Sequence, residues 1–322
     1  MENSDLALSV VLGGTKCNAA LVSSNGELIK ESASMLGGAS ATGVASLIME
    51  QVETLLAHAA LKHLQVCGVG ISVPGIYDQQ RGTVWAPHID GWEKYPLHRF
   101  LKDHLTRHDL PLLIESERGA SMLGEYWLGA SKGIRDAIFF SAGKGIGAGI
   151  LSDGRLVRGA HDNAGAAGWM ALQRPFEAKF KRFGNFEYYA SGDGLVRAAM
   201  EMNSRSSSRF FQKESRGDLK TEELFVAYEK RDPVAIKVID QAIELWGMAC
   251  ANMVSLLNPE IIVFGGEVFG PGVQFLERIY REAIRWAQPV AMRRVRFLPS
   301  ELKENAPLQG IAYQLFQFST ES

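Results

Sequence analysis

One pattern, present twice in the chain, constrains the fold more than any other feature. Residues 5–35 place an apolar run, a glycine turn, a second apolar run, a tight turn at Asn25-Gly26 and a third run in that order. Residues 137–159 repeat this order, with their tight turn at Asp153-Gly154. Because such turn residues tolerate positive φ, each stretch is expected to form β-hairpins. The repetition predicts an internally duplicated chain with a cleft between two similar halves.

Apolar periodicity predicts helices and buried strands between and after these hairpins. Residues 41–63 carry apolar side chains at helical spacing, whereas residues 66–75 and 112–115 read as buried strands. A second helix is expected to start near Ser116. Later in the chain the pattern predicts a long helix that Pro259 stops, one more buried strand and two closing helices, at residues 232–258, 260–266, 276–286 and 310–316.

Composition excludes several classes of protein. The chain has 322 residues, 46% of them hydrophobic and 22% charged, with a net charge of -2, which is typical of a soluble globular protein of two domains. The sequence has no excess of basic residues, whose positive potential would bind nucleic acid. The first residues carry acids, at Glu2 and Asp5, in place of a secretion signal, and no run of about 18 apolar residues predicts a membrane span. A cytoplasmic protein without membrane partners is expected.

The cysteines and one polar stretch complete this outline. Cys17, Cys67 and Cys250 are odd in number and far apart, so neither a disulfide framework nor a CxxC zinc site is expected. Residues 201–221 are rich in Ser, Arg and Lys and break every period, which predicts an irregular excursion within the second half.

Two glycine turns are the best candidates for chemistry. "LGGTK" covers residues 12–16 and "AGKGIGAG" covers residues 142–149, and Gly265-Gly266 follows a late buried strand. Glycine lets backbone N–H groups crowd around one oxyanion. Neither turn fits the Walker A pattern or the dinucleotide GxGxxG pattern, so each remains open between a phosphate site and a structural turn.

The order of motifs resembles the ROK family of bacterial sugar kinases and related repressors. The motifs are "GGTK", "GVGISVPGIYD", "GWEKYPL", "GASMLGE", "GKGIGAGILSDGRLVRGAHDNAGAAGWM", "EYYASGDGL", "LLNPEIIVFGGEV" and "ENAPLQGIAYQLF". The resemblance implies an α/β fold of the actin and hexokinase type, a duplicated ribonuclease H-like fold with two lobes around a central cleft. The lobes are expected at residues 1–118 and 119–308, with residues 309–322 returning as a helix to the first. Few residues precede the first hairpin, so the winged-helix domain of the repressor branch is not expected.

The resemblance implies transfer of the γ-phosphoryl group of ATP to a sugar hydroxyl. Such a reaction needs a phosphate cradle, a cation and a carboxylate base. The expected cofactor-binding residues are Gly13, Gly14, Thr15, Lys16, Gly143, Lys144, Gly145, Gly265 and Gly266. Family members place an acid that helps to hold Mg²⁺ where this chain has Val11, so a Mg²⁺ site is open to question. Lys144 replaces a family Thr, and either contacts the phosphate or is a solvated turn residue.

The family base is the Asp of an Asn-Asp pair, and Ser116-Glu117 stands at that place. Glu117 is the candidate catalytic base, although its carboxylate lies one methylene further out, and a shift of about 1 Å can cost on the order of a hundredfold in rate. Ser116 is a candidate substrate contact. The alternative is ordinary helix capping by Ser116 with a favourable charge at Glu117.

Four further residues are assigned to the sugar pocket through the resemblance. Gly75 ends the strand of residues 66–75, and His88 stands where the family has a sugar-binding Asn. Trp169 stands where the family has a zinc-binding His, and a space-filling role is favoured over stacking on a sugar. Glu187 matches a family carboxylate that can touch the sugar. Surface roles remain open for His88 and Glu187.

No zinc site is expected, and no residue is assigned as a metal ligand. The family's cysteine cluster is replaced by "AKFKRFGNFE", and a structural zinc site needs four closed ligands. The hypothesis that follows is an ATP-dependent kinase of carbohydrate metabolism, a phosphotransferase acting on a sugar or polyol, and a homodimer by resemblance. The alternative is a degenerate member that binds a sugar, sugar phosphate or nucleotide as a sensor.

Overall fold

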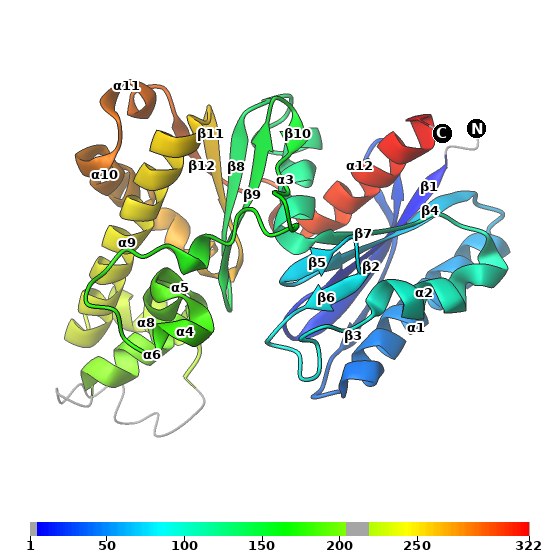
Figure 1. Ribbon diagram of the computed structural model, residues 1–322, viewed down its shortest axis with the longest axis horizontal. Coiled ribbons are helices and arrows are strands. Elements are labelled where there is room, and N and C mark those ends of the chain that lie inside the picture. Colours follow the sequence, from blue (N-terminus) through cyan, green and yellow to red (C-terminus); the bar gives the residue numbers. More distant parts are fainter. Residues whose placement is uncertain (1–4, 204–218, 322) are drawn as a thin grey trace. The chain divides into compact units, whose positions relative to one another are not determined.

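The computed structural model describes residues 5–203 and 219–321. The chain divides into two compact units (Figure 1). Unit 1 consists of Met1–Gly133, Leu156–Ala164 and Glu301–Ser322, and unit 2 consists of Ile134–Arg155 and Gly165–Ser300. Unit 1 therefore extends past the expected boundary at residue 118, and it includes a short segment from the middle of the chain.

Unit 1 is built on a five-stranded sheet in the order β3-β2-β1-β4-β7. β1 pairs antiparallel with β2 and parallel with β4, and β4 pairs parallel with β7. The strands are β1 (Leu6–Leu12), β2 (Lys16–Ser23), β3 (Leu28–Met35), β4 (Val66–Val73) and β7 (Leu112–Ser116), beside a small ribbon of β5 (Ile76–Asp78) and β6 (Thr83–Trp85). The helices are α1 (Ala41–Leu61), α2 (Leu97–Leu105), α3 (Glu117–Trp127) and α12 (Ala306–Glu321), with 3-10 turns η1 (Thr106–His108) and η5 (Lys303–Asn305).

Alternate residues of β1 serve two different cores, because successive strand side chains point to opposite faces. Leu8 and Val10 pack with α1 and α2, whereas Ala7 and Val11 pack with Leu308, Ala312 and Leu315 of α12. Both faces of the sheet are covered, which explains why β1 reads as one apolar run.

The extension of unit 1 beyond residue 118 follows from close packing of α3 on α12. A Cβ at Gly310 would lie 1.7 Å from the carbonyl oxygen of Ala120, and one at Gly124 would lie 2.1 Å from that of Ala306. Glycine at these places lets the two helix backbones approach each other. α3 therefore completes unit 1 instead of opening unit 2.

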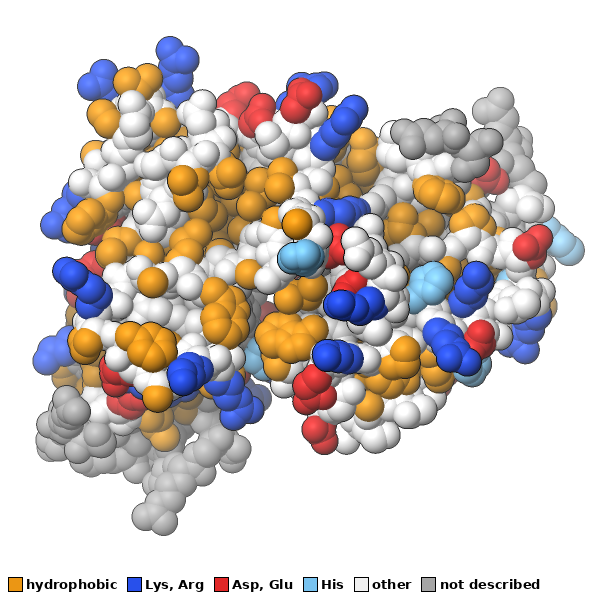
Figure 2. Space-filling view, viewed as in Figure 1, with side chains coloured by type: hydrophobic (Ala, Val, Ile, Leu, Met, Phe, Trp, Pro, Cys, Tyr) orange, Lys and Arg blue, Asp and Glu red, His pale blue; other side chains and the backbone are white. Residues whose placement is uncertain are grey.

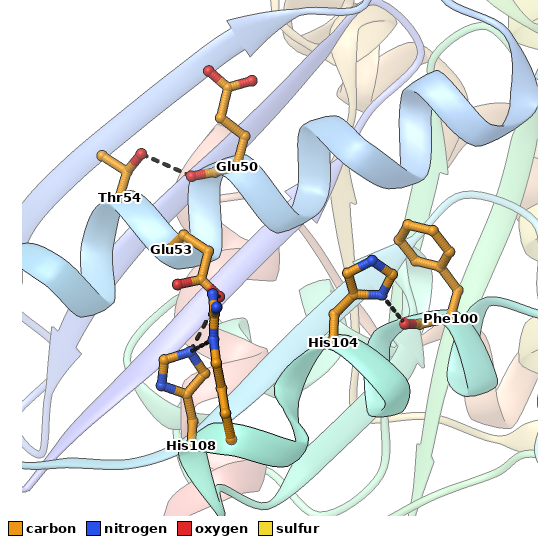
Figure 3. Close-up of polar contacts among 7 residues, drawn as sticks. Glu50, Glu53, Thr54, Phe100, His104 and His108 are labelled. Atoms are coloured by element: carbon orange, nitrogen blue, oxygen red, sulfur yellow. Dashed lines mark hydrogen bonds and ion pairs between the residues drawn. The ribbon is translucent and has the colours of Figure 1, made fainter.

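Helix α1 is long and apolar enough, by length and composition, to cross a membrane. Its Val44, Ile48, Val52 and Leu55 are buried in the core under the first sheet. A surface contact fixes its other side: Glu53 accepts hydrogen bonds from Arg107 and from His108 of η1, at 2.7 and 3.1 Å (Figure 3). Burial alone would raise the pKa of Glu53, but these partners outweigh it and the pKa is lowered. α1 thus has the contacts of a core helix.

The second sheet repeats the first, in the order β10-β9-β8-β11-β12. β8 pairs antiparallel with β9 and parallel with β11, which pairs parallel with β12. These strands are β8 (Ala137–Ala142), β9 (Ile146–Ser152), β10 (Arg155–Leu156), β11 (Ile261–Gly265) and β12 (Arg296–Pro299). The sheet order therefore supports the internal duplication that the repeated hairpin pattern predicts.

Helices pack against the second sheet around a core that includes Phe140, Trp246 and Phe264. They are α5 (Asn185–Ala190), α6 (Gly192–Asn203), α8 (Thr221–Glu229), α9 (Pro233–Leu257), α10 (Leu276–Trp286) and α11 (Pro289–Met292), with η2 (Ala167–Trp169), η3 (Glu267–Phe269) and η4 (Pro271–Phe275), whereas the short α4 (Phe180–Phe183) contacts α5. α9 begins at an Asp232 cap and ends at Asn258, whose φ is 46°, directly before Pro259 as predicted.

The irregular excursion predicted for residues 201–221 falls mainly on residues 204–218, which lie outside the described part of the chain. Its two ends are helical, because α6 runs to Asn203 and α8 begins at Thr221. On the face of the molecule that Figure 2 shows, basic and acidic side chains are interspersed, in keeping with the net charge of -2.

Candidate functional site

In unit 1, three predicted site segments follow strands that end at one edge of the sheet. β1, β4 and β7 are parallel neighbours, so their carboxyl ends share that edge. Gly13-Gly14 follow β1, Gly75 follows β4, and Ser116 ends β7 directly before Glu117. Ligands of open α/β sheets bind at this kind of edge.

The first glycine turn is closed by backbone hydrogen bonds. The Gly13 amide donates to the carbonyl of Lys16 at 2.9 Å, and the Leu36 amide donates to the carbonyl of Thr15 at 2.9 Å. The Lys16 ammonium lies 3.3 Å from the Glu304 carboxylate, so its charge is partly balanced within unit 1. Val11 is buried against α12 and brings no carboxylate to this turn.

Gly75 lets two loops of unit 1 meet. Its φ is 81°, and a Cβ there would lie 2.1 Å from the carbonyl oxygen of Trp85. His88, three residues further along that second loop, is exposed. The conformation of Gly75 is thus required by backbone packing, and His88 is accessible to a ligand.

Ser116 caps α3, as the capping alternative predicts. Its hydroxyl oxygen accepts a hydrogen bond from the Gly119 amide at 3.3 Å, and its φ and ψ are -67° and 143°. Glu117 then occupies the first turn, partly exposed, where the helix dipole stabilises a negative charge. Capping holds the backbone of Glu117 in place, and it leaves the role of its carboxylate open.

Glu115, which the motif analysis missed, is a buried carboxylate beside this cap. Its Oε1 accepts hydrogen bonds from the Ser116 amide at 2.8 Å and from the Ser116 hydroxyl at 3.1 Å. Its Oε2 pairs with Arg158, which belongs to the segment Leu156–Ala164 of unit 1. The available signal was an acid inside the apolar run "LLIES", because a buried acid is rarely left unpaired.

In unit 2, the second glycine turn and Gly265-Gly266 meet at the corresponding edge. The Gly143 amide donates to the carbonyl of Gly145 at 2.9 Å, which closes the turn after β8. Gly265 pairs with Ser141 in the ladder of β11 and β8. A Cβ at Gly266 would lie 2.5 Å from the carbonyl oxygen of Ala142, so the backbone after β11 touches the start of the turn.

The N-terminus of α6 contacts the same turn, a feature that sequence reasoning missed. The Gly192 amide donates to the Gly143 carbonyl at 2.7 Å, and the Ser191 hydroxyl accepts from the Gly194 amide at 3.0 Å. Helix N-termini favour anions through their free N–H groups and their dipole. The available signal was the sequence Ser191-Gly192-Asp193-Gly194, in which a serine precedes the helix start as a typical N-cap. Lys144 is exposed on this turn.

Gly266→Ala is expected to destabilise unit 2 and to weaken nucleotide binding. Gly266 has φ 86° and ψ 169°, a region that only glycine adopts readily, so any side chain costs about 1–3 kcal/mol before the clash with Ala142 is added. Urea unfolding and calorimetric titration with ATP measure the two effects. Gly270→Ala is the control, because its φ is -65° and its Cβ would lie 3.4 Å from the nearest atom. Equal effects of both changes would contradict the steric argument.

Glu187 brings together three segments of unit 2 that are distant in sequence. Its Oε2 accepts a hydrogen bond from the Ile146 amide at 2.7 Å, and Cβ atoms at Gly145 and Gly168 would lie 2.7 and 2.8 Å from that same oxygen. Burial raises its pKa to about 7, with Asp193 adding to the increase and Ile146 and Arg197 opposing it. Glu187 therefore exchanges its proton near neutral pH, beside the second glycine turn.

Glu187→Gln is expected to make stability less dependent on pH. Between pH 4.5 and about 7 the folded protein retains a proton that the unfolded chain has lost, so Glu187 lowers stability as the pH rises through this range. Glutamine keeps an acceptor for the Ile146 amide and does not titrate. The difference in melting temperature, variant minus parent, should therefore be larger at pH 8 than at pH 5. A constant difference would show that Glu187 does not titrate in this window.

Aromatic rings and cations occupy the segment that replaces the family's cysteine cluster. The Lys179 ammonium lies 4.9 to 5.4 Å from the ring centres of Phe180, Tyr188 and Tyr189, and Arg197 lies 4.4 Å from the ring of Tyr188. Within residues 5–203 and 219–321, no group of three or more His, Cys, Asp or Glu side chains could hold a metal ion. Cation–π contacts therefore stabilise the segment that stands where the family has its cysteine cluster.

Trp169 does not fill a closed space, contrary to the role favoured from the sequence. Trp169 is the last residue of η2 and is 49% exposed. The reason is local: the backbone at Trp169 packs against Gly184, where a Cβ would lie 2.7 Å from the Trp169 Cα, and this contact leaves the indole outside.

Comparison with known proteins agrees with the motif order. The family model described as "ROK family" matches residues 7–317. A glucokinase from Halalkalibacterium halodurans is 27% identical over 312 residues, which cover 94% of this chain and 92% of that protein. A xylose repressor from Caldicellulosiruptor bescii is 30% identical over 292 residues, which cover 88% of this chain and 71% of that protein.

Among solved structures, this chain is similar to a glucokinase from Streptomyces griseus in complex with glucose and AMPPNP. The two share 27% sequence identity with a TM-score of 0.78, over 97% of this chain and 99% of that chain. Kinases and repressors are thus both among the relatives, so the residues of the site must decide between the two functions.

Proposed function

Because this chain belongs to the ROK family and has its duplicated fold of the actin and hexokinase type, we propose that it phosphorylates a sugar or sugar-like polyol with ATP. The observation that carries the proposal is the arrangement in unit 2, where the turn Gly143–Gly145 meets the N-terminus of α6 and Gly266. The dipole of α6 favours a negative charge at its N-terminus, so a phosphate suits a position beside this turn.

Each part of the reaction has a candidate group. The resemblance to the family gives as candidate ATP contacts Gly143, Lys144, Gly145, Gly265 and Gly266 in unit 2, and separately Gly13, Gly14, Thr15 and Lys16 in unit 1. Glu117 would accept the proton of the attacking hydroxyl while the oxygen of that hydroxyl bonds to the γ-phosphorus and ADP leaves. Gly75, His88, Ser116, Trp169 and Glu187 would contact the acceptor. We further propose a cytoplasmic homodimer, which rests on the family alone.

The first turn does not fit the family's Mg²⁺ site. The family's acidic ligand is replaced by Val11, whose side chain is buried in the core with α12. No step is therefore assigned to a metal held by residue 11. A divalent ion that arrives with ATP would be bound by the phosphates instead.

Lys144→Thr is expected to lower kcat/KM for ATP about tenfold or more, because charge-assisted hydrogen bonds to phosphate are strong. The dependence of the rate on Mg²⁺ should also become steeper. Initial rates over a Mg²⁺ titration measure both effects. Lys181→Thr is the matched control, since Lys181 is also an exposed lysine of unit 2. Unchanged kinetics in Lys144→Thr would assign Lys144 to the solvated surface.

The experiment that tests the function measures ADP release and ligand binding on the same samples. A panel of neutral and acidic sugars and polyols is titrated by calorimetry and then assayed with ATP. ADP release that depends on one acceptor supports the kinase. Binding of a ligand without ADP release across the panel contradicts it.

A sensor is the second candidate function. It is favoured by Gly165–Trp169, which lacks the Glu and His that the family uses in its Gly-Glu-x-Gly-His stretch, and by the similarity to a xylose repressor. A protein retained for binding alone would keep the glycine framework and lose these groups. The ADP assay separates the two functions.

A further inference from the structure

Two arginine side chains flank the buried carboxylate of Glu115 in unit 1. Arg158 pairs with Glu115 directly, and Arg118 follows Glu117 in the first turn of α3. The Glu115 side chain is only 7% exposed and that of Arg158 is 25% exposed. Burial lowers the pKa of Arg118, and the charge of Glu115 opposes this effect. Both guanidinium groups are therefore partly removed from water near one shared carboxylate.

This carboxylate does not satisfy both arginines. Glu115 already accepts hydrogen bonds from the Ser116 amide, the Ser116 hydroxyl and Arg158. Among the described residues, the buried Nη2 of Arg118 and the buried Nε of Arg158 have no hydrogen-bond partner. A buried charged donor without an acceptor is costly, and such groups in a native protein are typically completed by water, an ion or a ligand.

Neighbouring groups in the described part of the chain form no hydrogen bond with the buried Nη2 of Arg118 or the buried Nε of Arg158. The Tyr77 hydroxyl remains neutral, because burial and the charges of Asp162, Asp78 and Glu115 raise its pKa to about 12. The Asp162 carboxylate accepts a hydrogen bond from the Gln79 amide at 3.0 Å. Asp78 pairs with the exposed Arg81. Two partly buried cations therefore lie near one buried carboxylate at the start of α3, where the helix dipole also favours negative charge.

We propose that the ligand of the Glu117 site carries an anionic group, a carboxylate or a phosphate, and that Arg118 binds this group with help from Arg158. The proposal rests on the proposed function only in placing the ligand at Glu117, and it requires no turnover. Arginine matches both oxyanions with its planar set of N–H donors. Ala166 stands where the family has a Glu that holds sugar hydroxyls, and its replacement fits a ligand held by different chemistry.

The test compares one sugar in neutral and anionic forms by calorimetry without nucleotide. Glucose, glucuronate, glucose 6-phosphate and inorganic phosphate are titrated in turn. At least one anionic sugar should bind about ten- to a hundredfold more tightly than glucose. Arg118→Met should remove this preference, and Arg118→Lys should restore part of it. Arg99→Met is the control, because Arg99 is an arginine of α2 whose side chain is 85% exposed.

Each outcome decides the proposal. Equal affinity for neutral and anionic sugars would overturn it, as would a preference that Arg118→Met leaves intact while the variant melts cooperatively. Inorganic phosphate binding as tightly as the sugar phosphate would show no sugar recognition and would also overturn it. Anionic sugar binding without ADP release supports this inference and contradicts the kinase. Phosphorylation of a neutral sugar, with no preference for anionic sugars in binding, supports the kinase and contradicts this inference.

Discussion

Glu117→Gln is expected to lower kcat for phosphoryl transfer by about a hundred- to ten-thousandfold, the range that a positioned general base contributes. Glutamine keeps the size of the side chain and cannot accept the proton of the attacking hydroxyl. Since Ser116 caps α3 through its own hydroxyl, the variant should keep the backbone of this turn. Single-turnover measurement of ADP release, with calorimetry of acceptor binding, separates lost chemistry from lost binding.

Glu31→Gln is the matched control, because Glu31 is an exposed glutamate on β3 of the same unit. Glu117→Asp adds a second comparison. If the longer side chain of Glu117 suits this acceptor, Glu117→Asp should lower kcat. If the extra methylene displaces the carboxylate from the position that the family base takes, Glu117→Asp should raise kcat. Unchanged kcat in Glu117→Gln would exclude Glu117 as the base.

The largest effect on stability is expected from Glu115→Ala, at about 3–5 kcal/mol in the free energy of unfolding. The variant would leave Arg158 and Arg118 without the carboxylate that balances them, and it would free the Ser116 amide. Urea denaturation followed by circular dichroism measures the loss. Adding chloride or phosphate should recover part of it, because an external anion can take the place of the carboxylate.

Glu277→Ala is the matched control for this prediction. Glu277 forms an exposed ion pair with Arg281, and exposed pairs are worth about 0–1 kcal/mol. A loss below 1 kcal/mol in Glu115→Ala would mean that water reaches the arginines freely. It would also weaken the case for an anion site beside them.

The sequence predicts the fold well because its strongest signals are local. The repeated hairpin pattern gives two sheets of matching order, and Pro259 marks the end of α9 as expected. In unit 1 the first glycine turn and Ser116-Glu117 follow parallel strands, and in unit 2 the second glycine turn and Gly266 do so, and the order of each sheet brings such strand ends to one edge of that sheet. These features depend on short stretches of chain and on general rules of β-sheet topology.

The parts that sequence reasoning missed depend on contacts between distant residues. Arg158 contacts Glu115 because the segment Leu156–Ala164 belongs to unit 1. No hydrophobic periodicity in the sequence predicts that this segment packs with unit 1. Gly192 meets the turn at Gly143 through packing of α6, and Trp169 is left exposed by a backbone contact with Gly184. Side-chain roles at a site are set by such tertiary contacts.

The discontinuous course of unit 1 has a consequence for biosynthesis. The chain passes between the units after residues 133, 155, 164 and 300, so all of unit 2 leaves the ribosome before α12 does. One face of the first sheet, with Ala7 and Val11, is covered by Leu308, Ala312 and Leu315 of α12. This apolar face therefore stays uncovered until all of unit 2 has been translated, because α12 follows unit 2 in the chain.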